Sequence, residues 1–285
     1  MNDYRDITYT SKDGLTLYAR DYPGPRPDVP VILCMHGLTR NSADFAGLAS
    51  HLASRFRVLV ADQRGRGRSE YDRNPANYTP ATYINDMFRL LDGEQVGRVL
   101  LLGTSMGGLM AMLMAAAEPS RFTGLVLNDI GPEVDPVGLA RIKTYVGKAQ
   151  PVSDWAGAIA QCRAMAGDAF PDFTEEQWSG FARALFREID GRPVLAYDPA
   201  IAEPMAATDD NAVPPDLWPV FDGIRHLPML LLRGVHSDIL APACVTEMQR
   251  RKPDLVVAVI PHRGHAPTLD EASSRVAIDR FLATF

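Results

Sequence analysis

The chain has 285 residues, of which 46% are hydrophobic and 22% are charged, and these values are typical of a soluble globular protein. Its formal net charge of −6 argues against a nucleic-acid-binding protein, whose surface would be basic. The chain starts with polar residues unlike a signal peptide, no apolar run reaches the roughly 18 residues of a membrane span, and three cysteines without metal spacing favour reduced thiols in a cytoplasmic protein.

Strand signals dominate the first third of the chain. Residues 7–10 and 15–22 alternate apolar with polar side chains on either side of an Asp-Gly pair, which predicts a β-hairpin. The apolar runs 31–35 and 57–61 are typical of strands that are buried on both faces of a parallel sheet. A helix is expected between them over 45–54. A glycine-rich loop at 62–69 and a helix over 81–91 follow.

The alternation of strands and helices runs to residue 129, stops, and resumes near residue 229. Residues 99–102 and 125–129 are predicted strands, and a helix over 109–117 joins them. After the interruption we expect a strand over 229–233, a helix around 244–251, a strand over 255–260 and a helix over 271–283. This order predicts an α/β protein with a doubly wound, mainly parallel sheet.

The interruption holds all three tryptophans and many prolines, and its pattern is helical and irregular. Because it stands between two sheet strands, we expect residues 133–222 to form a helical cap over the carboxyl edge of the sheet, where open α/β sheets bind ligands. Residues 1–132 and 223–285 would then form the sheet domain. About one third of the large apolar cap side chains are expected to face the cleft.

One turn carries a nucleophile signature. Gly103-Thr104-Ser105-Met106-Gly107 lies between a predicted strand and a predicted helix, which is the context of a G-x-S-x-G nucleophile. The two glycines leave room around a turn that is too sharp for larger residues, and the helix N-terminus favours a developing anion. We therefore predict that Ser105 is a catalytic nucleophile rather than part of a small-residue packing site.

A serine nucleophile needs a base, and the base needs an acid that orients it. His265 follows the last predicted strand and is favoured as the base over His262. No proton-transfer role is expected for the other four histidines, His36, His51, His226 and His236. Asp238 follows the strand at 229–233 and completes the chain order Ser105, Asp238, His265, so it is the predicted acid. Asp129, which ends the strand after the nucleophile, is the alternative.

The tetrahedral intermediate of acyl transfer needs two backbone donors. We expect them to be the amide of Met106, directly after the nucleophile, and the amide of Leu38, in the loop after the strand at 31–35. Only the backbone is needed for this role, so both side chains are free to line the pocket.

Together these pieces resemble the α/β-hydrolase family over nearly the whole chain. The resemblance rests on His36-Gly37-Leu38, the loop at 62–69, the Ser105 turn, Ser237-Asp238 and Gly264-His265. It implies the α/β-hydrolase fold, a Ser-Asp-His triad and a helical cap inserted after the sixth strand. It also implies that the 62–69 loop braces the site, and we expect its three arginines to pack in the scaffold rather than bind an anion.

The resemblance implies a serine hydrolase that acts on a small carboxylic ester or lactone through an acyl-enzyme, with no metal and no organic cofactor. Since no cluster of Lys or Arg is evident in the cap, we expect a largely apolar substrate. A carbon–carbon hydrolase of the meta-cleavage type and an iminopeptidase-like enzyme are alternatives, the latter with Glu133, Glu188 or Glu203 binding the substrate amine. A non-catalytic ligand-binding protein is the remaining alternative. The expected partner is a small molecule, with no nucleic acid and no membrane.

Overall fold

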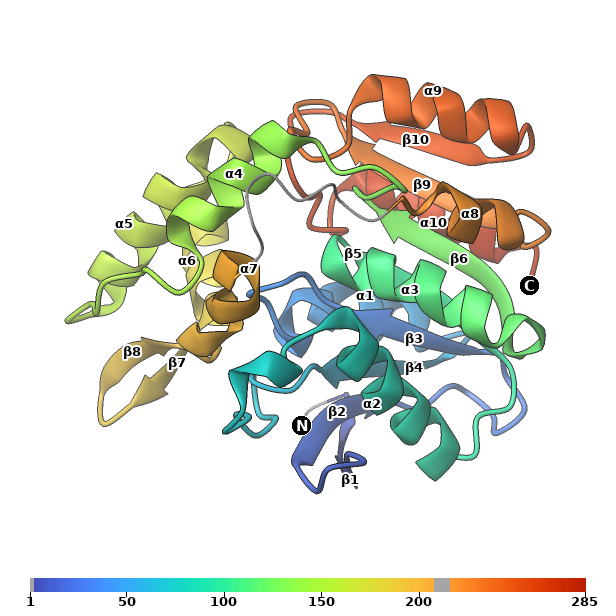
Figure 1. Cartoon of the computed structure of the whole chain (residues 1–285). Helices are drawn as coiled ribbons and strands as arrows, with labels where there is room; N and C mark the ends of the chain where they lie inside the picture. Colours follow the sequence, from blue (N-terminus) through green and yellow to red (C-terminus); the bar gives the residue numbers. More distant parts are fainter. Residues whose placement is uncertain (1–2, 208–215) are drawn as a thin grey trace.

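The computed structural model describes residues 3–207 and 216–285, which contain one eight-stranded sheet with the order β1-β2-β4-β3-β5-β6-β9-β10 (Figure 1). Its strands are β1 (Arg5–Thr10), β2 (Thr16–Tyr22), β3 (Val31–Met35), β4 (Arg57–Asp62), β5 (Val99–Thr104), β6 (Phe122–Asn128), β9 (Met229–Gly234) and β10 (Val256–Ile260). The hairpin β1–β2 is antiparallel and β2 joins β4 antiparallel, whereas all later neighbours are parallel. The predicted doubly wound, mainly parallel sheet is confirmed.

Both faces of the parallel strands are buried. In β3, Leu33 and Met35 belong to one core cluster, while Ile32 and Cys34 belong to the other. The first cluster includes side chains from α2 (Pro80–Gly93), α3 (Met106–Ala117), α8 (Trp218–Gly223) and α9 (Pro242–Arg251), and the second from α1 (Ala46–Leu52) and α10 (Ala272–Leu282). The continuous apolar runs of the strands therefore reflect two helical layers, one on each face.

A long insertion separates β6 from β9, the sixth and seventh strands of the sheet. It contains α4 (Pro136–Tyr145), α5 (Trp155–Ala166), α6 (Glu175–Leu185), β7 (Phe186–Ile189), β8 (Arg192–Leu195) and α7 (Glu203–Ala207). These elements gather on one side of the sheet in Figure 1. The helix α8 packs on α3 instead. The predicted domain limits at 132 and 222 stay a prediction, and residues 208–215 of the predicted cap lie outside the described residues.

The insertion also contains a β-hairpin, where we had expected only helical and irregular structure. The strands β7 and β8 pair antiparallel across Asp190 and Gly191, whose φ angles are +49° and +75°. An Asp-Gly pair is a strong signal for a two-residue turn with positive φ at both positions. The signal was present in the sequence, but the short flanking strands hid it.

Five short 3₁₀ helices complete the described elements: η1 (Ser42–Phe45), η2 (Pro75–Asn77), η3 (Pro119–Arg121), η4 (Gly167–Ala169) and η5 (Pro199–Ala202). The predicted helix at 45–54 corresponds to α1, which η1 directly precedes. No helix among the described residues is both long enough and apolar enough to cross a membrane.

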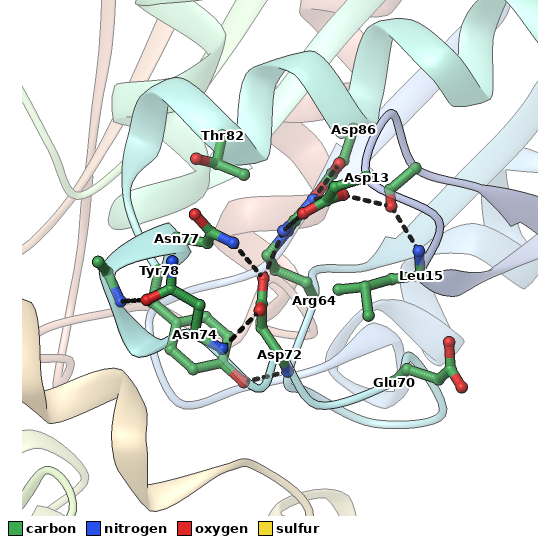
Figure 2. Close-up of polar contacts among 12 residues, drawn as sticks. Asp13, Leu15, Arg64, Glu70, Asp72, Asn74, Asn77, Tyr78, Thr82 and Asp86 are labelled. Atoms are coloured by element: carbon green, nitrogen blue, oxygen red, sulfur yellow. Dashed lines mark hydrogen bonds and ion pairs between the residues drawn. The ribbon is translucent and has the colours of Figure 1, made fainter.

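The loop at 62–69 is held by a buried ion cluster around Arg64 (Figure 2). Its guanidinium donates to both carboxylate oxygens of Asp86 on α2 and of Asp13 in the first hairpin, and to one oxygen of Asp72. Each of its three nitrogens has a carboxylate partner, which offsets the cost of burying the charge. The cluster ties the loop to α2 and to β1–β2, as expected for a scaffold role.

Candidate active site

Ser105 occupies a strained turn between β5, which ends at Thr104, and α3, which begins at Met106. Its φ is +52°, in a region that non-glycine residues rarely adopt. A Cβ atom on Gly103 would lie 2.2 Å from the carbonyl oxygen of Gly107, and one on Gly107 would lie 2.0 Å from that of Met35. The two glycines are therefore required by close backbone approach, as the sequence pattern predicted.

A chain of hydrogen bonds connects Ser105 with a histidine and an aspartate. The Nε2 atom of His265 lies 2.8 Å from the Ser105 hydroxyl, and its Nδ1 atom lies 2.7 Å from an Asp129 carboxylate oxygen. The side chain of Asp129 is fully buried. The rival His262 is exposed. The geometry that we predicted for Ser105 and His265 is present.

The prediction that Asp238, rather than Asp129, holds His265 is wrong. Asp238 instead accepts two hydrogen bonds from Arg141 on α4, at 2.5 and 3.0 Å. Burial raises the pKa of Asp238, but the hydrogen bond and charge of Arg141 outweigh it, so the pKa lies below its ordinary value. Asp238, the acid that the sequence favoured, is thus paired with an arginine of the insertion.

The position of Asp129 explains the correction. It follows β6 directly, and its other carboxylate oxygen accepts the Gly234 amide at the end of the neighbouring strand β9, at 2.8 Å. The Ser237 hydroxyl donates to the oxygen that also faces His265, at 2.6 Å. Asp238 comes four residues after β9 ends, where the loop has already turned toward α4. What distinguishes the two aspartates is where their carboxylates point in the folded chain, and the order of residues in the sequence does not give this.

The loop after β3 is fixed by buried polar contacts. The Nε2 atom of His36 accepts the Gln63 amide at 3.0 Å, so the proton is on Nδ1, which donates to the Gly37 carbonyl at 2.7 Å. Burial lowers the pKa of His36 from 6.5 to about 3, so the ring is neutral. Arg66 donates to the Leu38 carbonyl at 2.9 Å. These bonds set the orientation of the Leu38 peptide beside Ser105.

The two predicted oxyanion donors come from different segments, Met106 from the start of α3 and Leu38 from the loop after β3. Met106 opens α3, and an amide in the first turn of a helix has no partner within that helix. Leu38 and Ser105 both line the same cavity. Stabilisation of an oxyanion by these amides remains a prediction.

The cavity has a volume of about 440 Å³ and contacts both the sheet edge and the insertion. Ser105, His265 and Leu38 line it from the sheet. Four of the eight large apolar insertion residues that we weighed as cap side chains also line it, namely Met165, Phe170, Phe173 and Phe181. The others, Trp155, Trp178, Phe186 and Trp218, do not. We expect about one third of these side chains to line the cavity, and one half of them do.

Two arginines also reach the cavity, Arg40 from the loop after β3 and Arg141 from α4. Only the second belongs to the insertion, so among the described lining residues the insertion contributes one cationic side chain rather than a basic cluster. By contrast, none of the three arginines in the 62–69 loop is among the lining residues. Arg64 and Arg66 are buried in the scaffold, and Arg68 pairs with Asp6.

A family model described as alpha/beta hydrolase fold matches residues 30–267. The chain belongs to this family. A crystal structure of an α/β hydrolase from Novosphingobium aromaticivorans superposes on this α/β hydrolase with a TM-score of 0.94, 42% identity and complete coverage of both chains.

Two curated relatives have named reactions. A 3-hydroxybutyrate-oligomer hydrolase from Cupriavidus necator is 34% identical over 255 residues, which cover 87% of this α/β hydrolase and 86% of the relative. A 2-(acetamidomethylene)succinate hydrolase from Mesorhizobium japonicum is 28% identical over 83% of this chain and 81% of its own. The family and both relatives support a hydrolytic enzyme.

Proposed function

We propose that this α/β hydrolase is a serine hydrolase that cleaves a small, largely apolar carboxylic ester or lactone. The observation that carries the proposal is the hydrogen-bonded chain from Ser105 through His265 to Asp129, because its serine lines the cavity. A nucleophile, a base and an orienting acid in this order are what acyl transfer to serine requires. The Cupriavidus relative supports an ester substrate, because oligomers of a hydroxy acid are joined by ester bonds.

The proposed reaction starts with proton transfer from the Ser105 hydroxyl to Nε2 of His265 as Oγ attacks the ester carbonyl. The Met106 and Leu38 amides donate to the oxyanion. The imidazolium then gives its proton to the leaving alcohol, and an acyl-enzyme remains. Water attacks the acyl group in the same way and releases the acid and free Ser105. Asp129 accepts the hydrogen bond from the Nδ1–H group of His265 throughout, which holds the ring in the required tautomer.

The iminopeptidase-like alternative lacks support at the cavity. Glu133 accepts the indole N–H of Trp218 and Glu188 accepts that of Trp155. Neither glutamate, nor Glu203, is among the described residues that line the cavity. None of the three glutamates considered for a substrate amine therefore lines the cavity.

The test is Ser105→Ala assayed with p-nitrophenyl butyrate, beside labelling with a fluorophosphonate probe. We expect the variant to fold and to lose at least about 10³-fold in kcat, because its nucleophile is gone. Wild type should be labelled and the variant should not. Ser153→Ala, at an exposed serine of the insertion, is the matched control and should keep both activities. A wild-type protein that neither turns over esters nor takes the label would point to a non-catalytic binding protein.

A further inference from the structure

The cavity contains a charged donor that the proposed acyl-transfer steps do not use. Arg40 lines it two residues after Leu38, and its Nε and Nη2 atoms donate to the two carboxylate oxygens of Asp44 at 2.8 and 2.6 Å. Its guanidinium lies over the ring of Phe181 on α6, 4.1 Å from the ring centroid. Since Asp44 and Phe181 hold it on one edge and one face, the group is fixed before any ligand arrives.

The Nη1 atom of Arg40 is buried and has no hydrogen-bond partner in the described part of the chain. Leaving a buried donor unpaired is costly, and most buried polar groups in proteins are paired. Figure 2 shows the contrasting case of Arg64, where each nitrogen meets a carboxylate. Three other arginines also have one unpaired buried nitrogen, but none of them is among the cavity-lining residues: Arg20, Arg66 and Arg121.

We propose that Arg40 is a specificity-determining residue that binds a carboxylate of the substrate, so that the natural substrates are short esters with an apolar body and one free carboxylate. This inference rests on the proposed ester hydrolysis and deepens it. Asp44 occupies the Nε–Nη2 edge of the guanidinium, whereas Nη1 has no acceptor among the described residues. A planar fork of this kind binds carboxylates through two parallel hydrogen bonds.

A second carboxylate on an arginine that already has one is compatible with this protein. Arg64 holds three carboxylates at once, from Asp13, Asp72 and Asp86. The other cavity arginine, Arg141, is occupied on its Nε–Nη2 edge by Asp238. Among the described residues that line the cavity, Arg40 thus has a buried nitrogen, Nη1, without a hydrogen-bond acceptor. The aromatic and aliphatic lining would contact the apolar body of the same substrate, since binding pockets combine apolar walls with a few placed polar groups.

The test compares two matched pairs of esters. The linear dimer of 3-hydroxybutyrate is assayed beside its methyl ester, and monoethyl glutarate beside ethyl methyl glutarate, with product release measured by chromatography. The first pair places the carboxylate on the alcohol side of the scissile ester, and the second on the acyl side. We expect wild type to prefer the acid over its neutral partner in at least one pair. Arg40→Met should lower kcat/KM for that acid by about 10- to 100-fold and change its neutral partner by less than about 3-fold.

Further variants separate binding from folding. Arg40→Lys keeps the charge but lacks the fork, so it should recover only part of the preference for the acid. The double variant Arg40→Met with Asp44→Leu removes the carboxylate that the single variant leaves unpaired, and it should show the same loss. Arg163→Met, at an exposed ion pair with Glu175, is the matched control and should behave like wild type. In the Ser105→Ala background, the dimer should bind measurably by calorimetry, and Arg40→Met should weaken that binding.

The outcomes distinguish this inference from the proposed function. If wild type hydrolyses both members of each pair equally, or if Arg40→Met slows acid and neutral esters alike, ester hydrolysis stands and the role of Arg40 is overturned. If wild type hydrolyses none of these esters nor p-nitrophenyl butyrate, the proposed function itself fails.

Discussion

Asp129 combines a fully buried carboxylate with three hydrogen-bond donors: the Gly234 amide, the Ser237 hydroxyl and Nδ1 of His265. The first two fix the carboxylate independently of the histidine. The ring therefore meets an acceptor that is already oriented, and only the tautomer with its proton on Nδ1 fits. This tautomer leaves Nε2 free to accept the proton of Ser105.

Replacing Asp129 should lower kcat strongly, whereas replacing Asp238 should change it little. Asp129→Asn places an amide where the histidine needs an acceptor and favours the wrong tautomer, so kcat for p-nitrophenyl butyrate should fall by about 10³- to 10⁴-fold. Asp238→Asn weakens a half-exposed ion pair with Arg141 and should change kcat by less than about 10-fold. Steady-state kinetics on both variants, with thermal melting to check folding, decides the matter. A large loss in Asp238→Asn with Asp129→Asn active would reverse the assignment.

At the level of elements, the loop after β3 is held in place by hydrogen bonds from the loop at 62–69. The loop at 62–69 supports the Leu38 peptide through Arg66 and the His36 ring through the Gln63 amide. Arg64 anchors the same loop to α2 and to the first hairpin. Arg66 donates both to the Leu38 carbonyl and to the Arg64 carbonyl, so it connects the residue at the centre of the ion cluster with the loop that is predicted to hold the oxyanion.

Arg64→Met should destabilise the protein by about 3–5 kcal/mol at neutral pH, because three carboxylates lose their common partner. Arg64 holds the pKa of Asp13 well below its ordinary value. The stability from this contact is therefore present above the unfolded pKa of about 3.9 and is lost as the pH falls through the folded value. The difference between wild type and variant should shrink as the pH is lowered from neutral toward 3.

Urea denaturation at several pH values measures this difference. Arg68→Met is the control, since Arg68 is 56% exposed and pairs with an exposed aspartate, Asp6. Surface pairs of this kind contribute about 0–1 kcal/mol. A loss in Arg64→Met that is no larger than in Arg68→Met would show that the cluster does not brace the loop.

At the level of the whole molecule, residues of the insertion and of the sheet edge together line the cavity. The helices α4 and α6 supply Arg141, Tyr145 and Phe181, while Ser105 and His265 come from the sheet side. The Arg141–Asp238 ion pair ties α4 to the loop after β9, beside the cavity. The insertion therefore limits the size of any group that reaches Ser105.

Acyl chain length should be limited accordingly. A cavity of about 440 Å³ lies at the lower end of the range for small-molecule pockets, so p-nitrophenyl esters of about two to six acyl carbons should be the best substrates. The value of kcat/KM should fall steeply for acyl chains of about twelve carbons or more. A series of p-nitrophenyl esters measures this directly. Equal turnover of the laurate and butyrate esters would mean that the insertion moves well away from the sheet during catalysis.

Much of the fold and half of the site follow from local patterns. The buried strands, the β1–β2 hairpin and the Ser105 turn were predictable, because continuous apolar runs, an Asp-Gly turn and two flanking glycines act within a few residues. His265 was predictable from its place after the last strand. The β7–β8 hairpin was missed although its Asp-Gly pair is just as local, since strands of four residues give little periodicity.

The identity of the acid and the presence of Arg40 in the cavity were decided only by tertiary structure. Asp129 and Asp238 follow strands that are adjacent in the sheet, so the sequence by itself placed both near His265. Arg141, 97 residues before Asp238 in the chain, engages that carboxylate and leaves Asp129 as the partner of the histidine. Arg40 lines the cavity, where Asp44 and the distant Phe181 hold its guanidinium. Local sequence determines which turns and strands form, whereas side-chain direction at the site depends on partners that only the folded chain brings together.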